Sequence, residues 1–364
     1  MNHSATSAAS VVDNIIPSVR ALHPYTLAAT VAPVKLNQNE SPWDVPDTFK
    51  QAVLERCARA DWNRYPDFYP VDVLRGIGEL HGLNEHWVML GNGSNELISA
   101  VLAAAVGAGQ QVAFPVPTFS LYAMMIAAAQ GECVEVPLDE QLQYPVDTFR
   151  QLADEGRAHL LLCTPNNPTG SRLSSDVISD LAARTPRLVI VDEAYMHFGP
   201  DDHSRLLERH PNLVVLRTLS KALGLAGVRL GYALAHPALT EQINKVKLPY
   251  NVGIFGLEVA RELLANPGLA DEHARRLVQE RDRVVTTLQG WTNALTVFEG
   301  HANFVLVRLA DPNGVWKALF EQGILVRNVS HYPGLAGCLR LSIGTPEQND
   351  LLLAALSDLV QVNP

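Results

Sequence analysis

The chain alternates short apolar runs with segments long enough to be helices, and this rhythm limits the possible folds more than any other feature. Seven such runs precede residue 250, at 87–90, 111–115, 133–137, 159–163, 188–191, 213–216 and 229–234. Strands that alternate with helices build an α/β fold with a doubly wound, mostly parallel sheet. Ligands of such sheets bind just beyond the carboxyl ends of the strands, so functional residues are expected there.

The pattern changes after residue 250. Residues 251–289 are helical in character, with Pro267 opening a long charged segment. Strands are expected at 303–309, 324–327 and 338–343, with one helix near 315–322. Because 364 residues exceed the usual size of one core, we expect two domains. The expected division is an N-terminal arm with part of a small domain at 1–45, a large domain at 46–250, a helical link at 251–290 and a small α+β domain at 291–364.

The composition argues against several classes of function. The formal net charge is -10 and the pI is near 5.6, whereas nucleic acids and anionic membranes bind clustered basic residues. The apolar run at 100–108 is too short to cross a bilayer, and the first ten residues lack the basic start and apolar core of a secretory signal. The four cysteines form no CxxC pair, so we expect no metal site and a reducing cytoplasm.

Lys221 has surroundings that no other lysine of the chain shares. Two hydroxyls precede it at Thr218 and Ser220, small residues follow it, and Arg229 lies eight positions later. A neighbouring cation lowers the pKa of a lysine and so favours the neutral amine that attacks an aldehyde. The hydroxyls and the guanidinium are donors for a phosphate. This combination describes a pyridoxal phosphate site, although Ser-Lys alone would more often be an ordinary loop after a strand.

Two upstream segments favour the cofactor site over the ordinary loop. The run at 188–191 leads into Asp192, whose carboxylate can hold the proton on the pyridine nitrogen of the cofactor. Tyr195 follows three residues later and can donate to the phenolic oxygen of the cofactor, as can Asn167 in the turn after 159–163. Without this context, Asp192 would be interpreted as a strand-terminal residue that caps the next turn.

A glycine-rich turn at 91–93 follows the first strand and opens a helix. Backbone N–H groups at the start of a helix, with help from the helix dipole, form a cradle for a phosphate. Ser94 and Asn95 are therefore candidate phosphate ligands. Taken alone, such a turn is more often a simple helix cap.

Three of these motifs occur in the order and at the intervals seen in class I/II aminotransferases of fold type I. They are Asn-Pro-Thr-Gly at 167–170, Asp-Glu-Ala-Tyr at 192–195, and Ser220-Lys221 with Arg229. Further segments at 36–40, 64–66, 216–221 and 338–344 resemble the histidinol-phosphate aminotransferases within that group. The resemblance extends over nearly the whole chain. It implies a large domain with a mostly parallel sheet, a small α+β domain, and pyridoxal 5'-phosphate as the cofactor.

The resemblance also implies roles for residues that the patterns alone leave unassigned. Phe119 matches the aromatic residue that stacks on the cofactor ring. Tyr65 matches a tyrosine that reaches the cofactor phosphate of the neighbouring subunit, which implies a homodimer with a shared active site. The implied substrate-binding residues are Arg340, which matches an arginine that grips an α-carboxylate, with Arg327, Tyr25 and Asn39. The implied reaction converts histidinol phosphate and 2-oxoglutarate to imidazole-acetol phosphate and glutamate, with Lys221 as the proton carrier.

Alternatives remain for the residues and for the activity. Phe119 and Tyr25 could be packing residues, Tyr65 part of an aromatic surface turn, and Arg327 a surface arginine on a strand. The activity could instead be that of an aromatic amino-acid aminotransferase or of a threonine-phosphate decarboxylase, a lyase that needs no oxo-acid acceptor. A cofactor-sensing domain of a transcription regulator is disfavoured, because the short N-terminal segment leaves no room for a helix-turn-helix module.

Overall fold

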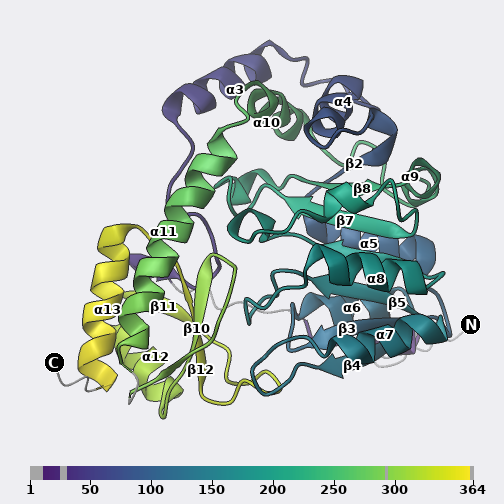
Figure 1. Ribbon diagram of the computed structural model, residues 1–364. Coiled ribbons are helices and arrows are strands. Elements are labelled where there is room, and N and C mark those ends of the chain that lie inside the picture. The colour runs from purple at the N-terminus through teal and green to yellow at the C-terminus, as the bar shows by residue number, and fades with distance from the viewer. Residues whose placement is uncertain (1–10, 25–30, 292–293, 361–364) are drawn as a thin grey trace, which may run out of the picture.

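The computed structural model describes residues 11–24, 31–291 and 294–360. Within them, two β-sheets lie side by side and are joined by a long helix, as Figure 1 shows. None of the described helices combines the length and the apolar character that crossing a membrane would require.

The larger sheet confirms the doubly wound, mostly parallel sheet predicted from the sequence. Its seven strands are β2 (Val88–Gly91), β3 (Gln111–Val116), β4 (Glu132–Pro137), β5 (Ala158–Cys163), β6 (Val189–Asp192), β7 (Leu213–Thr218) and β8 (Gly231–Ala235). They are ordered β2-β8-β7-β6-β5-β3-β4. Strand β8 runs antiparallel to both of its neighbours, and the other adjacent pairs are parallel.

Most predicted strand boundaries differ from the observed ones by one or two residues, and two of these differences have a clear structural cause. Trp87 ends a 3-10 helix, η1 (Glu85–Trp87), so strand β2 begins one residue later. Arg229 follows another 3-10 helix, η4 (Ala226–Val228), in the left-handed conformation with φ 57°, which a strand cannot contain. Strand β8 therefore begins at Gly231, and Arg229 is free to turn toward the end of the sheet.

Helices cover both faces of the large sheet. One face packs against α5 (Ser94–Ala105), α6 (Leu121–Ala128) and α9 (Pro237–Asn244). The other packs against α4 (Val71–Leu80), α7 (Val146–Glu155), α8 (Ser175–Arg184) and α10 (Ile254–Ala265). Side chains of one strand alternate between the two cores: Leu161 of β5 joins the first, and Leu160 and Leu162 join the second. This double burial explains why the strands are continuous apolar runs.

The smaller sheet combines residues from both ends of the chain. Its strands are β1 (Val34–Leu36), β9 (Thr296–Val297), β10 (Phe304–Arg308), β11 (Ile324–Asn328) and β12 (Cys338–Ser342), in the order β1-β11-β12-β10-β9. The helices α11 (Leu269–Gln289), α12 (Pro312–Glu321) and α13 (Pro346–Val360) pack against it around a separate core. Because β1 pairs with β11, we propose the domain division expected from the sequence, with residues before 46 contributing to the small domain.

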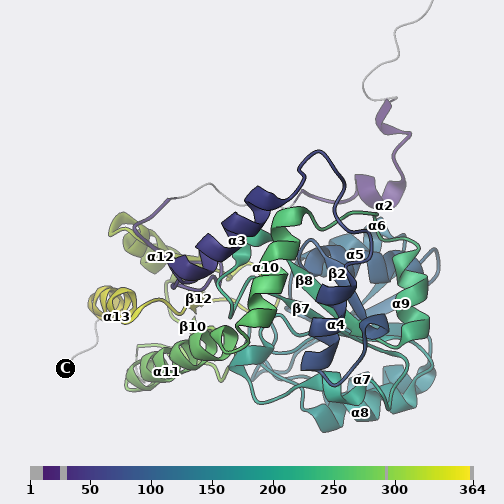
Figure 2. The same ribbon diagram turned by 90° about the horizontal axis from the view of Figure 1, so that it is seen from above.

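The remaining described elements lie around the large sheet. Helix α3 (Asp47–Arg59) lies beside α10, and the short α2 (Pro17–Arg20) lies near α6, as Figure 2 shows. Two further 3-10 helices, η2 (Met196–Phe198) and η3 (His203–Leu206), follow strand β6. The carboxyl ends of β5, β6 and β7 lead into loops that line a cavity to which the small sheet also contributes.

Candidate active site

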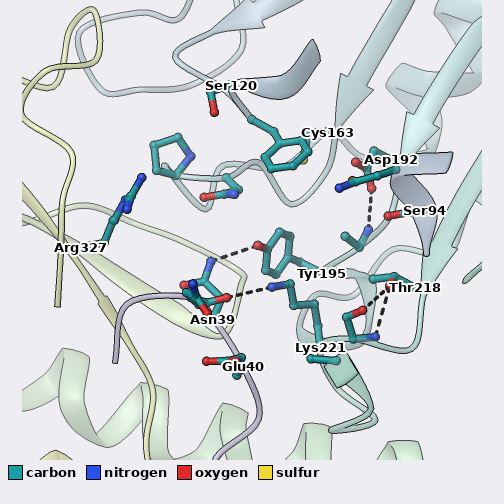
Figure 3. A pocket seen from close by; sticks show the side chains of 18 of the residues that line it. Asn39, Glu40, Ser94, Ser120, Cys163, Asp192, Tyr195, Thr218, Lys221 and Arg327 are labelled. Carbon is teal, nitrogen blue, oxygen red and sulfur yellow. Dashed lines mark hydrogen bonds between the residues drawn. The ribbon is translucent and has the colours of Figure 1, made fainter. Parts of the chain in front are cut away.

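A cavity of about 600 Å³ is lined by residues from both sheets and from the loops that follow their strands. It brings together most of the site residues predicted from the sequence, and Figure 3 shows several of them converging on one space. The predicted residues that line it are Asn39, Ser94, Asn95, Phe119, Asn167, Asp192, Tyr195, Thr218, Ser220, Lys221, Arg229, Arg327 and Arg340. Segments separated by up to three hundred residues in the sequence thus form one site.

The Lys221 amine reaches into this cavity and has a strongly lowered pKa. Its Nζ donates a hydrogen bond of 2.9 Å to the carbonyl of Gln38 and lies 5.7 Å from the centre of the Tyr195 ring. Burial lowers the pKa of Lys221 to about 8, and the charge of Arg340 acts in the same direction. The sequence attributed this lowering to Arg229, but the effect of Arg229 is smaller than that of burial or of Arg340. A substantial fraction of the amine is therefore neutral near pH 8.

Asp192 is buried at the end of strand β6 with both carboxylate oxygens bonded. Oδ2 accepts a 2.6 Å hydrogen bond from the hydroxyl of Tyr122, and Oδ1 accepts one of 3.0 Å from the backbone N–H of Ala194. Burial raises the pKa of Asp192, and these two donors oppose the rise. The carboxylate also lines the cavity, so it can hold a positively charged group of a ligand.

Tyr195 and Asn39 lie together on the side of the cavity next to the small sheet. The Asn39 amide donates a 3.0 Å hydrogen bond to the Tyr195 hydroxyl, and its oxygen accepts one of 2.7 Å from Ser342. Asn39 has φ 55°, a left-handed conformation that asparagine adopts more readily than most residues. Burial raises the pKa of Tyr195, so this hydroxyl keeps its proton and can donate it to a ligand.

Ser94, Thr218, Ser220 and Arg229 form a group of donors at one end of the cavity. Thr218 donates to Ser220 at 3.0 Å, and Arg229 Nη1 lies 3.2 Å from the same Ser220 oxygen. Helix α5 begins at Ser94, so its free backbone N–H groups belong to this group. Gly93 has φ 78°, and a Cβ there would lie 2.6 Å from Arg229 Nη2. The positive φ is the conformation that favours glycine at residue 93, and a side chain there would also displace the end of the Arg229 guanidinium.

Two arginines project from the small sheet. Arg327 on β11 and Arg340 on β12 are directly paired in register. Arg340 is bonded to the Asn167 amide oxygen at 2.5 Å and to the Asn37 carbonyl at 2.6 Å. Arg327 points into the cavity (Figure 3), and no carboxylate in residues 11–24, 31–291 or 294–360 forms an ion pair with it. Adjacent like charges of this kind favour an anionic ligand.

Sequence reasoning gave no role to several residues of the cavity region. Tyr122 holds Asp192, Glu40 lines the cavity and pairs with Lys35, and Tyr332 forms part of the wall. Tyr122 lies three residues after Phe119, so the two side chains are neighbours at the start of α6, and their rings make an edge-to-face contact at 5.5 Å. That spacing is the one sequence signal that could have linked Tyr122 to the site.

Two predicted site residues are not placed in the cavity. Tyr65 is 81% exposed and stacks on Tyr250 with ring centroids 4.6 Å apart, so within one chain it does not reach the cavity. Tyr25 lies outside the described residues.

The family follows from comparison of this chain with known proteins. The family described as Aminotransferase class I and II matches residues 32–356, and the chain therefore belongs to it. The histidinol-phosphate aminotransferase of Chlorobium luteolum is 41% identical over 328 residues, which cover 90% of this chain and 92% of that relative.

Solved structures agree with the fold. The histidinol-phosphate aminotransferase of Sinorhizobium meliloti, solved in complex with pyridoxal-5'-phosphate, has a TM-score of 0.85 at 23% identity and covers 97% of this chain and 99% of its own. The L-threonine-O-3-phosphate decarboxylase of Porphyromonas gingivalis has a TM-score of 0.78 at 20% identity, with 90% and 99% covered. At these identities the likeness shows the fold alone, and it does not separate the two activities.

Proposed function

We propose that this chain is a pyridoxal-phosphate-dependent aminotransferase that reversibly converts L-histidinol phosphate and 2-oxoglutarate to imidazole-acetol phosphate and L-glutamate, a step of histidine biosynthesis. Relatives at 37–41% identity carry the name of this activity. The structural observation that carries the proposal is the pair of arginines, Arg327 and Arg340, on the substrate side of the cavity. Both substrates bring an anion that such a pair can bind.

The residues of the cavity fit pyridoxal phosphate. The phosphate would lie among Ser94, Asn95, Thr218, Ser220 and Arg229, with Gly93 leaving room for it. Asp192 would hold the ring nitrogen, Asn167 and Tyr195 the phenolic oxygen, and Phe119 the face of the ring. When bound, the cofactor supplies an aldehyde that takes up an amino group and a protonated ring that withdraws electrons.

Lys221 carries the proton in this proposal. Its amine would hold the cofactor through the aldehyde and would be released when the amine of the substrate takes its place. The freed Lys221 amine would then act as the base that takes up the proton from the amine-bearing carbon of the substrate and as the acid that gives it back. A group that acts as both base and acid works best when its pKa lies near the working pH, and the pKa of Lys221 is lowered to about 8. The Tyr195 ring lies 5.7 Å from this amine, and its hydroxyl can help to orient the reacting groups.

The arginine pair explains how one pocket accepts two kinds of anion. Arg340 would bind the α-carboxylate of glutamate, and Arg327 would bind the phosphate monoester of histidinol phosphate. Tyr25 and Asn39 are further proposed substrate-binding residues. Both polar ends of the Asn39 side chain are already bonded to Tyr195 and Ser342, so its proposed contact with substrate would share these bonds.

A product assay with the purified protein tests the proposal. With histidinol phosphate, glutamate should form only when 2-oxoglutarate is present, and the kinetics should be ping-pong. Carbon dioxide released from threonine phosphate without an oxo acid would assign the chain to the decarboxylases. A higher kcat/KM for phenylalanine or tyrosine than for histidinol phosphate would assign it to the aromatic aminotransferases.

We further propose a cytoplasmic homodimer in which Tyr65 completes the site of the partner subunit. The surface around Tyr65 supports this, because Trp62, Phe68 and Tyr250 are also exposed beside it, and exposed apolar patches mark interfaces. All four cysteines are free thiols, as expected in a reducing compartment. Sedimentation at decreasing concentration, with activity measured in parallel, tests the dimer. A monomer that remains fully active would exclude the shared site.

A further inference from the structure

A buried tyrosine that the proposed chemistry does not use is bonded directly to Asp192. Tyr122 is 0% exposed on helix α6, and its hydroxyl donates to Asp192 Oδ2 at 2.6 Å. The second oxygen of the carboxylate is bonded to the backbone N–H of Ala194. One side-chain donor and one backbone donor therefore fix the plane of the carboxylate, and the side chain has little freedom to rotate.

Tyr122 also contacts the aromatic wall of the cavity. Its ring meets that of Phe119 edge to face, with centroids 5.5 Å apart and planes inclined at 83°. Phe119 lines the cavity, and Tyr122 lies behind it. A single buried side chain thus touches both the residue proposed to hold the ring nitrogen and the residue proposed to cover the ring face.

The hydroxyl has an electrostatic effect as well as a steric one. A carboxylate removed from water is disfavoured in its charged form, and a donor to that form restores part of the lost solvation. Hydrogen bonds to an ionised acceptor are stronger than neutral ones. Because Asp192 is 4% exposed, the Tyr122 hydroxyl replaces water for its carboxylate.

We propose that Tyr122 is a positioning residue for the transamination: it keeps Asp192 ionised and aimed at the cofactor ring nitrogen, and holds Phe119 against the ring. The inference rests on the proposed function, since it gives Asp192 and Phe119 the roles assigned there. Tyr122 itself does not line the cavity, so it acts through these two residues.

Besides Tyr144, which precedes α7, and Tyr195, which follows β6, four titratable groups face Asp192 from the elements around it. Tyr122 comes from α6, Cys163 from the end of β5, Glu193 is the next residue along the chain, and Lys221 follows β7. Of these, Tyr122 and Lys221 favour the ionised carboxylate, and Glu193 opposes it. Tyr122 is the one that bonds to the carboxylate itself. Its removal should therefore change the proton affinity of Asp192 without changing the net charge.

Tyr122→Phe tests the proposal, and Tyr144→Phe is its matched control. Tyr144 is also a buried phenol, 7% exposed, but its hydroxyl donates to the backbone carbonyl of Cys163. Both variants lose one buried hydroxyl and its hydrogen bond, so thermal unfolding of each apoprotein measures the general cost of that loss. Tyr122→Phe alone should lower kcat about tenfold with the Michaelis constants nearly unchanged, and weaken pyridoxal phosphate binding to the apoprotein. Equal effects of the two substitutions would overturn the proposal.

If Tyr122→Phe folds poorly, a variant with fluorotyrosine at position 122 still tests the proposal. Fluorotyrosine at position 122 keeps the packing but makes the hydroxyl a stronger donor. The pH midpoint of the visible absorbance of the bound cofactor should shift in one direction with phenylalanine and in the opposite direction with fluorotyrosine. An unshifted midpoint with fluorotyrosine, or a shift in the same direction as with phenylalanine, would show that the hydroxyl does not act on Asp192.

A double-mutant cycle isolates the route through Asp192. In an Asp192→Asn background, adding Tyr122→Phe should cause no further loss of cofactor affinity, because the charge on which the hydroxyl acts is already absent. Additive losses would contradict the proposal. The affinity and absorbance readouts use the cofactor alone. They therefore stand even if the substrate screen assigns a different reaction, and a failed screen with a normal Tyr122 result would overturn only the proposed function.

Discussion

The two walls of the cavity carry different arrangements of charged side chains. On the wall built by the large sheet, charged groups have partners within the chain: Asp192 is held by Tyr122, and Glu193 behind it pairs with Arg217 at 2.7 Å and His203 at 2.6 Å. On the wall built by the small sheet, Arg327 and Arg340 face the cavity side by side. Under the proposed function, the first wall would hold the cofactor, and the second would bind the anions that differ between the two substrates.

The Glu193–Arg217 ion pair shows how charges on the first wall are neutralised by partners within the chain. Burial alone would raise the pKa of Glu193, but the Arg217 guanidinium and the hydrogen bonds from His203 together hold that pKa below its ordinary value. Removing one partner of a buried ion pair costs about 3–5 kcal/mol, because the other charge is left uncompensated. Arg217 precedes Thr218 and Glu193 follows Asp192, so this pair ties together the two strand ends that carry the proposed cofactor ligands.

The largest effect is expected on the first wall, at Lys221. Lys221→Ala should lower turnover by about 10⁴-fold or more, since both the amine that binds the cofactor and the proton carrier are lost. Single-turnover assays measure this. Borohydride treatment of the wild-type holoenzyme should fix the cofactor to Lys221 and leave Lys247, whose pKa burial also lowers, unlabelled. A label on Lys247 would refute the assignment.

Asp192→Asn should have the next largest effect. The substitution keeps the shape of the side chain but removes the charge that holds the proton on the ring nitrogen, so kcat should fall by about 10² or more. Cofactor affinity, measured on the apoprotein, should fall less, because the phosphate donors remain. Near-normal turnover in this variant would remove Asp192 from the mechanism.

The second wall should show a smaller and selective effect. Arg327→Ala should raise the Michaelis constant for histidinol phosphate about 10- to 100-fold, the value of a charge-assisted bond, and leave that for phenylalanine nearly unchanged. Arg308→Ala is the control, because Arg308 lies on the adjacent part of the sheet over the Phe298 ring and outside the cavity. Equal increases in the Michaelis constants for histidinol phosphate and phenylalanine would mean that Arg327 does not bind the phosphate.

The sequence predicted the first wall better than the second, for a physical reason. Lys221, Asp192 and Asn167 lie at or just after apolar strands, and parallel strands bring their carboxyl ends to one edge of a sheet. The strands themselves were predictable because burial on both faces makes them apolar throughout. The place of these three residues at the ends of predicted strands was therefore enough to predict where they lie in the fold.

Contacts between distant segments were not predictable in this way. Asp192 and Tyr122 are seventy residues apart, and helix α6 shows only an apolar pattern until it is packed against the sheet. Gln38 and Glu40 reach the cavity because β1 pairs with β11, nearly three hundred residues later. The order of effects on the pKa of Lys221 also needed the fold, since Arg340 lies on the other sheet.

The smallest expected effect connects the two walls through the pKa of Lys221. Only the neutral amine attacks the cofactor aldehyde, so the rate at which the apoprotein takes up pyridoxal phosphate should rise with pH through a midpoint near 8 and level off above it. Arg340→Gln removes a positive charge that disfavours the ammonium form, so the pKa should rise and the midpoint of the curve should move to higher pH. Glu40→Gln removes a negative charge that favours the ammonium form, so the midpoint should move to lower pH. Stopped-flow absorbance across the pH range measures both midpoints. Shifts in the same direction would mean that the small sheet does not tune the lysine of the large one.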